Sequence, residues 1–156
     1  DTLISVVDHL EVRLPDGPRD SEALIVDPVS NDLYLFSKRE SEINVYEIKN
    51  WSNGDDSTVA KFLLQLPFTQ ITAADISSDG AELLIKNYEN VYYWKRDVSK
   101  PFASIFENSA RVLPYAQEPQ GESIAFDIYG IGYYTVSEYA KGKIPHFILS
   151  LLFSIV

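Results

Sequence analysis

Residues 20–48 carry the pattern that decides the fold, and they read DSEALIVDPVSNDLYLFSKRESEINVYEI. Short apolar runs in this stretch are separated by turn-forming residues, a pattern that predicts three consecutive antiparallel strands. Similar patterns follow at residues 72–96, TAADISSDGAELLIKNYENVYYWKR, and at residues 121–138, GESIAFDIYGIGYYTVSE. The chain therefore repeats one unit of short strands roughly every fifty residues.

Repeats of this length are typical of β-propellers, in which four-stranded antiparallel meanders form blades around a central channel. We therefore predict an all-β fold of propeller-type blades in an incomplete ring. One blade is expected at residues 20–66, a second at 71–115 and a partial blade at 121–138. Residues 3–14 are expected to form the outer strand of a preceding blade, or a segment that latches the ring.

The C-terminal residues do not continue the repeat. Where the first two repeats have a third strand containing Val-Tyr, residues 141–156 read KGKIPHFILSLLFSIV. We expect residues 140–156 to be an atypical apolar tail outside the blade pattern, or otherwise an apolar third strand. The last ten residues are too few for a membrane span, which needs about 20. Membrane contact is therefore expected only if residues 144–156 act as an anchor.

The composition indicates an acidic globular domain. The chain has 156 residues, of which 46% are hydrophobic, enough for one domain with a sizeable core. Lys and Arg number 13 against 23 Asp and Glu, which gives a formal net charge of −10. This charge opposes binding to nucleic acid and favours cations, basic partners or solubility. Because the chain has no Cys, disulfides and thiolate metal sites are excluded.

Acidic residues recur where the predicted inner strands begin. The repeats can be aligned on the aspartate that follows each inner strand: Asp27, Asp79 and Asp127. In this alignment Glu22 and Glu122 each lie five residues before the aspartate. The matching position in the second repeat is Ala74, with Asp75 next to it.

Inner strands of a propeller line its central channel, so these carboxylates are expected to converge at one mouth. Oxygen ligands gathered in this way suit calcium, which takes roughly six to eight of them. We therefore expect a calcium site formed by Glu22, Asp75 and Glu122. The alternative is structural: the acids accept backbone hydrogen bonds or pair with Lys38 and Lys86, because buried acids are commonly paired.

The strings DSEALIVDP, ITAADISSDG and QGESIAFD each precede a hydrophobic strand. Together they resemble secreted or periplasmic β-propeller proteins of the broad WD40/YVTN-like kind, over about residues 1–139. The resemblance implies an extracellular or periplasmic protein with more blades than the three for which this chain has material. It implies a fold far more specifically than an activity.

The sequence contains no recognisable catalytic set. His9 and His146 lie far apart without a Cys partner, which opposes a zinc site. There is neither a G-x-S-x-G elbow nor a phosphate-binding glycine loop. We therefore favour a non-catalytic binding or scaffold module, whose ligand is an unidentified protein or small molecule.

Two alternatives stay open. One is a calcium-dependent propeller hydrolase, lactonase-like or phytase-like, in which Glu22, Asp75 and Glu122 hold the metal and activate water. Convergence of these carboxylates would distinguish it. The other is a remnant without an independent function, because an open stack of blades exposes a strand edge that invites pairing or aggregation.

Overall fold

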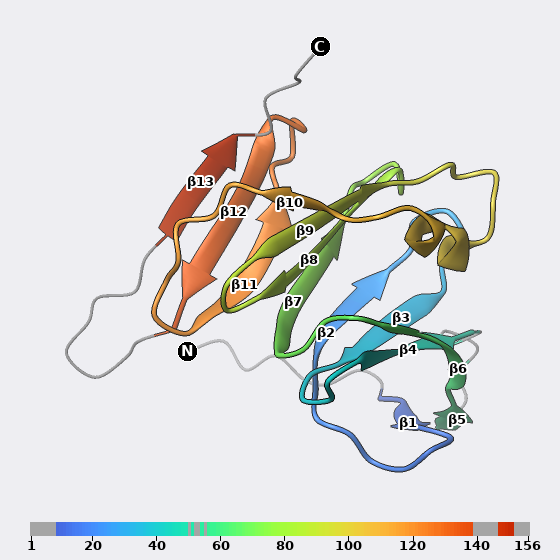
Figure 1. Ribbon diagram of the computed structural model, residues 1–156. Coiled ribbons are helices and arrows are strands. Elements are labelled where there is room, and N and C mark those ends of the chain that lie inside the picture. The colour runs from blue at the N-terminus through green and yellow to red at the C-terminus, as the bar shows by residue number, and fades with distance from the viewer. Residues whose placement is uncertain (1–8, 50, 52–53, 55, 139–146, 152–156) are drawn as a thin grey trace, which may run out of the picture.

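The computed structural model describes residues 9–49, 51, 54, 56–138 and 147–151, and these residues form an almost wholly β structure (Figure 1). Three antiparallel sheets follow one another along the chain, and two short strands, at residues 11–13 and 57–59, form a separate pair. The prediction of an all-β fold built from blade-like antiparallel meanders is confirmed.

Each sheet is a meander whose strands are added in chain order. Sheet 1 consists of β2 (Ser21–Val26), β3 (Leu33–Ser37), β4 (Ile43–Ile48) and β6 (Lys61–Leu66). Sheet 2 consists of β7 (Ile71–Ile76), β8 (Glu82–Asn87), β9 (Val91–Lys95) and β10 (Arg111–Leu113), with the 3-10 helix η1 (Phe102–Glu107) before the last strand. Sheet 3 consists of β11 (Gly121–Phe126), β12 (Gly132–Ser137) and β13 (Phe147–Leu151).

The inner strands β2, β7 and β11 lie side by side, and the sheets fan outward from them (Figure 1). These strands begin at positions 21, 71 and 121, a constant spacing of 50 residues. In all three sheets the first hairpin has an irregular register directly after the first residue of the inner strand. The extra residue at each irregularity is Glu22, Thr72 or Glu122.

Two hydrophobic clusters hold the sheets together, one at each sheet-to-sheet contact. The first joins sheets 1 and 2 and covers η1; its buried members include Ile25, Tyr34, Phe36, Val45, Leu83, Ile85, Trp94 and Phe102. The second joins sheets 2 and 3; its buried members are Ala73, Leu84, Val91, Tyr93, Leu113, Ile124 and Tyr133. Because side chains alternate between the two faces of a strand, sheet 2 contributes alternate residues to the two clusters.

The N-terminal segment differs from its prediction. Residues 1–8 lie outside the described part of the chain, and the strand within the predicted 3–14 is β1 (Glu11–Arg13). It pairs in parallel with β5 (Ser57–Val59). Leu10, Val12 and Leu14 pack against a small cluster on the outer face of sheet 1. Of this segment, the described residues 9–14 therefore cover part of sheet 1 and form no strand of a preceding sheet.

Of the two expectations for the C-terminal residues, the apolar third strand is the one that the structure shows for residues 147–151. Phe147–Leu151 does not stand outside the pattern but forms β13, the third strand of sheet 3. The strand pairs antiparallel with β12, with Val136 opposite Phe147 and Gly132 opposite Leu151. Residues 140–146 and 152–156 of the predicted tail lie outside the described residues.

Within the described part of the chain, no helix has the length and apolar character needed to span a membrane.

Candidate functional site

The candidate site is formed where the three inner strands begin. Glu22, Thr72 and Glu122 occupy the irregular position of their strands. A bulge leaves its extra residue out of the regular pairing and redirects its side chain, and bulges are frequent beside active sites. The sequence thus places one redirected polar side chain per sheet at the same edge of the molecule.

A second set of equivalent residues follows the second strand of each sheet. Ser37, Asn87 and Ser137 pair with the first residue of the inner strand in their sheets. The residues that come next are Lys38, Tyr88 and Glu138. We call these three together with Glu22, Thr72 and Glu122 the inner-edge cluster.

Lys38 is the centre of this cluster, and its side chain is only 4% exposed. Its Nζ lies 2.5 Å from Glu22 Oε2 in the same sheet and 3.9 Å from Glu122 Oε1 in sheet 3. It also donates a hydrogen bond of 3.1 Å to Tyr88 Oη in sheet 2, and that hydroxyl donates one of 2.6 Å to Glu122. One ammonium group therefore links all three sheets.

The electrostatics of the cluster follow from its excess of acids. Burial acts to lower the pKa of Lys38, but hydrogen bonds with Glu22 and Tyr88 raise it above its ordinary value. The nearby charge of Glu122, a hydrogen bond with Glu122 and weak burial raise the pKa of the Glu138 carboxyl. Three carboxylates thus share one buried ammonium, and the cluster keeps a negative charge at neutral pH.

A pocket of about 490 Å³ opens beside these groups. Its lining is mainly polar and comes from sheets 1, 2 and 3: Glu22, Thr72, Glu122, Ser123, Val136, Ser137 and Glu138. The three carboxylates face this pocket, whereas Lys38 is not among its lining residues. A cation that enters the pocket would therefore meet carboxylate oxygens before it meets the ammonium.

Asp75 lies apart from the two glutamates with which it was predicted to bind metal. Its Oδ2 accepts a hydrogen bond of 2.6 Å from the Phe126 backbone amide, which joins the inner strands of sheets 2 and 3. It lines another pocket, of about 330 Å³, together with Leu24 and Val26. Burial raises the pKa of the Asp75 carboxyl even though hydrogen bonds from backbone amides oppose the increase.

The expected three-carboxylate calcium site is consequently not assembled from these residues. Only Glu22 and Glu122 come together, and their shared neighbour is the ammonium group of Lys38. No group of three His, Cys, Asp or Glu side chains suited to a metal ion occurs among the described residues. For Glu22, the pairing with Lys38 matches the structural alternative considered from the sequence.

The prediction for Asp75 was wrong because the repeats were aligned on aspartates that do not occupy equivalent positions. In sheets 1 and 3 the backbone amides of Asp27 and Asp127 donate hydrogen bonds to the backbone carbonyls of Asp32 and Gly132. In sheet 2 the amide that donates the equivalent hydrogen bond belongs to Ser77, not to Asp79. Asp79 lies in the turn, where its carboxylate accepts hydrogen bonds from Ser77 and from the Ala81 amide. The true counterpart of Glu22 and Glu122 is therefore Thr72.

Four members of the cluster were not predicted as site residues: Thr72, Tyr88, Glu138 and Lys38, the last of which was expected only as a structural partner of the acids. The constant spacing of 50 residues is the signal that could have found Thr72 and Tyr88, because it places Thr72 midway between Glu22 and Glu122. The same spacing places Tyr88 midway between Lys38 and Glu138. Lys86 does not join the cluster: it is buried two residues earlier, between sheets 2 and 3.

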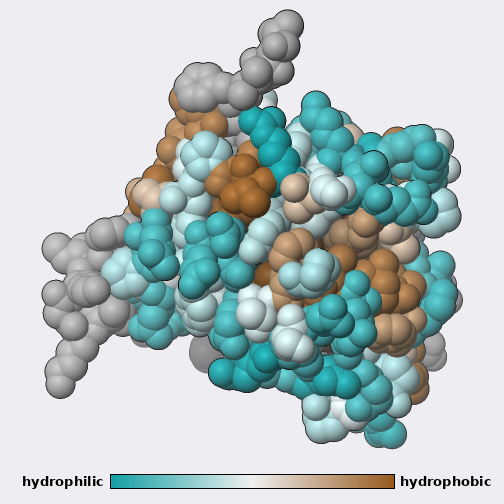
Figure 2. All heavy atoms as spheres, viewed as in Figure 1, coloured by the Kyte–Doolittle hydropathy of each residue, from teal (hydrophilic) through white to brown (hydrophobic). Residues whose placement is uncertain are grey.

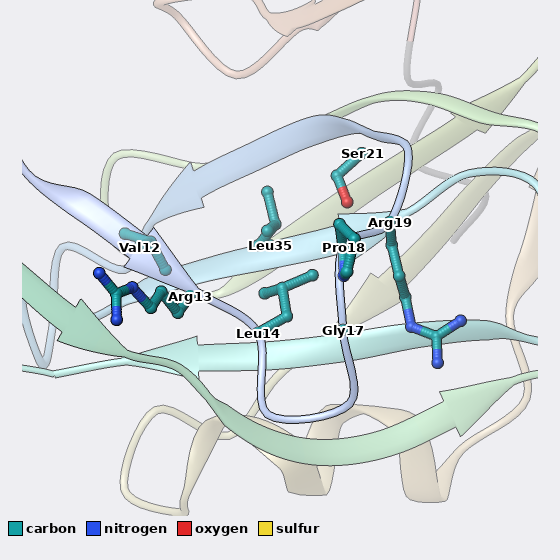
Figure 3. Close-up of a pocket in the computed structure, with 8 residues that line it drawn as sticks. All are labelled: Val12, Arg13, Leu14, Gly17, Pro18, Arg19, Ser21 and Leu35. Carbon is teal, nitrogen blue, oxygen red and sulfur yellow. The ribbon is translucent and has the colours of Figure 1, made fainter.

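A third pocket, of about 580 Å³, lies on the outer face of sheet 1 (Figure 3). Leu14 and Leu35 lie at its centre, and the guanidinium groups of Arg13 and Arg19 extend to either side. Arg19 is already paired with Asp16 at 2.7 Å and with Glu40 at 2.8 Å. The pocket is therefore an apolar hollow and offers no free cation at Arg19.

No protein-family model matches the chain, and no curated protein matches its sequence. Among solved structures the chain is similar to a chain of Kuenenia stuttgartiensis hydrazine synthase, with a TM-score of 0.55 and 13% sequence identity. The match covers 83% of this chain and 34% of that chain, so this chain spans about a third of its length. Hydrazine synthase contains a β-propeller. At this identity the likeness concerns the fold alone, an all-β arrangement of propeller-like sheets.

Proposed function

We propose that this chain is a non-catalytic binding module of the β-propeller type, and that the inner-edge cluster binds a cationic group of a protein or small molecule. One observation carries the proposal: the carboxylates of Glu22, Glu122 and Glu138 line one pocket and have a single buried ammonium among them. An organic ammonium or guanidinium group would offset part of the remaining negative charge and donate hydrogen bonds to the carboxylate oxygens.

The properties of the whole chain support the same ligand class. The net charge of −10 attracts cations and basic segments, and it opposes nucleic acid as a partner. The resemblance to WD40/YVTN-like propellers supports placing the protein outside the cytoplasm, in the extracellular space or the periplasm. In this proposal the three sheets are blades of an incomplete ring, with boundaries near residues 20–66, 71–115 and 121–151.

Calorimetric titration with cadaverine tests the proposal, with 1,5-pentanediol as the uncharged probe of the same chain length. We expect saturable binding of the diamine, none of the diol, and weaker binding as the salt concentration rises. Glu122→Gln should weaken diamine binding by roughly tenfold, since it removes a charged hydrogen-bond acceptor. Glu107→Gln is the matched control, because Glu107 is exposed at the end of η1.

A folded protein that binds neither probe would contradict the proposal. Equal binding to the wild-type chain and to Glu122→Gln would place the binding elsewhere on the acidic surface.

The calcium-dependent hydrolase, lactonase-like or phytase-like, stays a prediction. In this structure a calcium ion would need Glu138 in place of Asp75, and it would compete with the Lys38 ammonium for Glu22 and Glu122. Titration of the same proteins with calcium chloride separates the two functions. Saturable calcium binding that Glu122→Gln abolishes, together with calcium-dependent hydrolysis of a lactone or a phosphoester, would favour the enzyme.

A further inference from the structure

Lys86 departs from the repeat at a position where the other sheets have apolar side chains. The constant spacing of 50 residues makes Phe36 in sheet 1 and Val136 in sheet 3 its equivalents, each in the second strand of its sheet. Phe36 and Lys86 are both fully buried, so the fold accepts an apolar side chain at this position. Figure 2 shows that hydrophilic side chains cover much of the face in view, which is where lysines ordinarily lie. A buried charge is costly, so this lysine calls for an explanation beyond stability.

Gly121 departs from the repeat as well, and it makes room for this lysine. The inner strands of sheets 1 and 2 begin with Ser21 and Ile71, which have side chains. A Cβ atom at Gly121 would lie 2.8 Å from Lys86 Nζ, closer than such atoms approach each other. The two departures lie in adjacent sheets and fit together, so Lys86 and Gly121 form one feature of the molecule.

The Lys86 ammonium holds the backbone directly before two members of the inner-edge cluster. It donates a hydrogen bond to the Gly121 carbonyl, directly before Glu122. It donates another, of 3.1 Å, to the Asn87 carbonyl, directly before Tyr88. Tyr88 and Glu122 in turn share the 2.6 Å hydrogen bond of the cluster. One buried ammonium therefore fixes, from behind, the peptide groups that carry both side chains.

The ammonium acts on the cluster through its charge as well. Burial lowers the pKa of Lys86 to about 8, and the charges of Glu118 and Glu122 limit the decrease. The titratable side chains around the ammonium in the described part of the chain are Tyr115, Glu118 and Glu122. Burial raises the pKa of Tyr115 to about 12, so its hydroxyl keeps its proton at pH 9. Lys86 therefore changes its charge between pH 7 and pH 9, whereas Tyr115 does not.

We propose that Lys86 makes cation binding at the inner-edge cluster depend on pH, with weaker binding while its ammonium is charged and stronger binding once it is neutral. The inference rests on the proposed function and names the regulation of the same site. A charged Lys86 weakens the negative potential at Glu122 and repels a second cation, whereas a neutral amine does neither. The neutral amine keeps N–H groups that donate to the Gly121 and Asn87 carbonyls, so the cluster keeps its geometry.

The coupling between the ligand and the proton is reciprocal, because two linked sites change each other's affinity by the same factor. A cation bound at Glu122 must therefore favour loss of the proton from Lys86, just as loss of that proton favours the cation. We expect a factor of about five, at the lower end of the range that is typical of linked sites.

Calorimetric titration with cadaverine at pH 7 and at pH 9 tests this inference. The wild-type chain should bind the diamine about fivefold more tightly at the higher pH. Lys86→Met lacks the change of charge and should lose this increase, and any titration of the probe itself appears equally in both proteins. The exposed Lys100→Met is the matched control and should keep the increase.

A second measurement needs only the wild-type chain. The proton dissociation constant of Lys86, followed by the carbon chemical shift of its Cε in NMR, should rise about fivefold when cadaverine saturates the site. A role of Lys86 in packing alone would instead lower the affinity of Lys86→Met equally at both pH values, and it would leave the dissociation constant unchanged.

The outcomes separate this inference from the function on which it rests. Parallel pH profiles of the wild-type chain and Lys86→Met, in proteins that bind cadaverine, would overturn the pH dependence and leave the proposed function intact. Absence of cadaverine binding at both pH values would overturn the proposed function, and the pH dependence with it.

Discussion

Lys86 is fully buried between sheets 2 and 3, which is unusual for a lysine. Its ammonium donates hydrogen bonds to the Gly121 carbonyl and, at 3.1 Å, to the Asn87 carbonyl, and it lies 4.6 Å from the centre of the Tyr115 ring. Burial lowers its pKa to about 8, although the charges of Glu118 and Glu122 oppose this decrease. The folded protein therefore carries a buried charge at neutral pH, and the described residues place no carboxylate in an ion pair with it.

This burial predicts how stability changes with pH. Below about pH 8 the folded protein bears the full free-energy cost of burying the charged Lys86 ammonium. This cost disappears as the pH rises towards the ordinary lysine pKa of 10.5, because the folded protein then holds Lys86 in its neutral form. The free energy of unfolding of the wild-type chain relative to Lys86→Met should thus increase by about 2 kcal/mol between roughly pH 7.5 and pH 9.5. Urea denaturation measures it, with the exposed Lys100→Met as control. Parallel pH profiles for the wild-type chain and Lys86→Met would contradict the assignment.

Asp27 and Arg96 form a buried ion pair that joins sheets 1 and 2, with 2.8 Å between Asp27 Oδ1 and Arg96 Nη1. Burial acts to raise the pKa of Asp27, but hydrogen bonds from Arg96, Val29 and Ser30 lower it overall. Arg96→Met should cost about 3–5 kcal/mol in the free energy of unfolding, because it leaves an uncompensated buried carboxylate.

The same pair allows a test of coupling. In urea denaturation, Asp27→Asn combined with Arg96→Met should cost less than the sum of the two single changes, since no unpaired charge remains. Strict additivity would show that the two side chains do not stabilise each other.

At the scale of elements, β13 depends on the absence of a side chain at Gly132. A Cβ atom at that position would lie 2.2 Å from the backbone carbonyl oxygen of Ser150, a contact that no side-chain rotation relieves. Gly132→Ala should therefore detach β13 from β12 and remove hydrogen-exchange protection from the amides of Phe147–Leu151. Ser123→Ala, in the adjacent strand β11, is the control and should leave that protection unchanged. Retained protection in Gly132→Ala would show that the pairing tolerates a shift.

The elements also show where sequence patterns were reliable. Short apolar runs between turn-forming residues located the start of each repeat to within one residue, since the inner strands begin at residues 21, 71 and 121. The pairing of Phe147–Leu151 with β12 was only the secondary expectation, since an unbroken apolar run does not reveal its partner. Aligning the repeats on their aspartates shifted the second repeat by two residues, because Asp79 lies two residues later in its turn than Asp27 does in the equivalent turn of sheet 1.

At the scale of the whole molecule, Lys38 connects three sheets through Glu22, Tyr88 and Glu122. Lys38→Met would leave the carboxylates facing one another without a cation, so it should destabilise the chain by about 1–3 kcal/mol at neutral pH. The loss should shrink as the pH falls towards 5, because the like charge of Glu122 raises the pKa of Glu138, which can then bind a proton in the folded state and relieve the repulsion. Urea titrations at the two pH values measure this, with the exposed Lys49→Met as control. A loss that is independent of pH would indicate packing rather than charge.

The amino-acid sequence by itself determined the fold class, the near fifty-residue repeat and the acidic character, because these depend on local patterns and composition. It also indicated that Glu22 and Glu122 would approach each other. Only the tertiary structure decided that they meet at Lys38 and Glu138, that Asp75 lies elsewhere, and that Thr72 and Tyr88 complete the cluster. The physical reason is that bulges and sheet-to-sheet packing set the direction of each side chain, and these depend on contacts about fifty residues apart that no local pattern records.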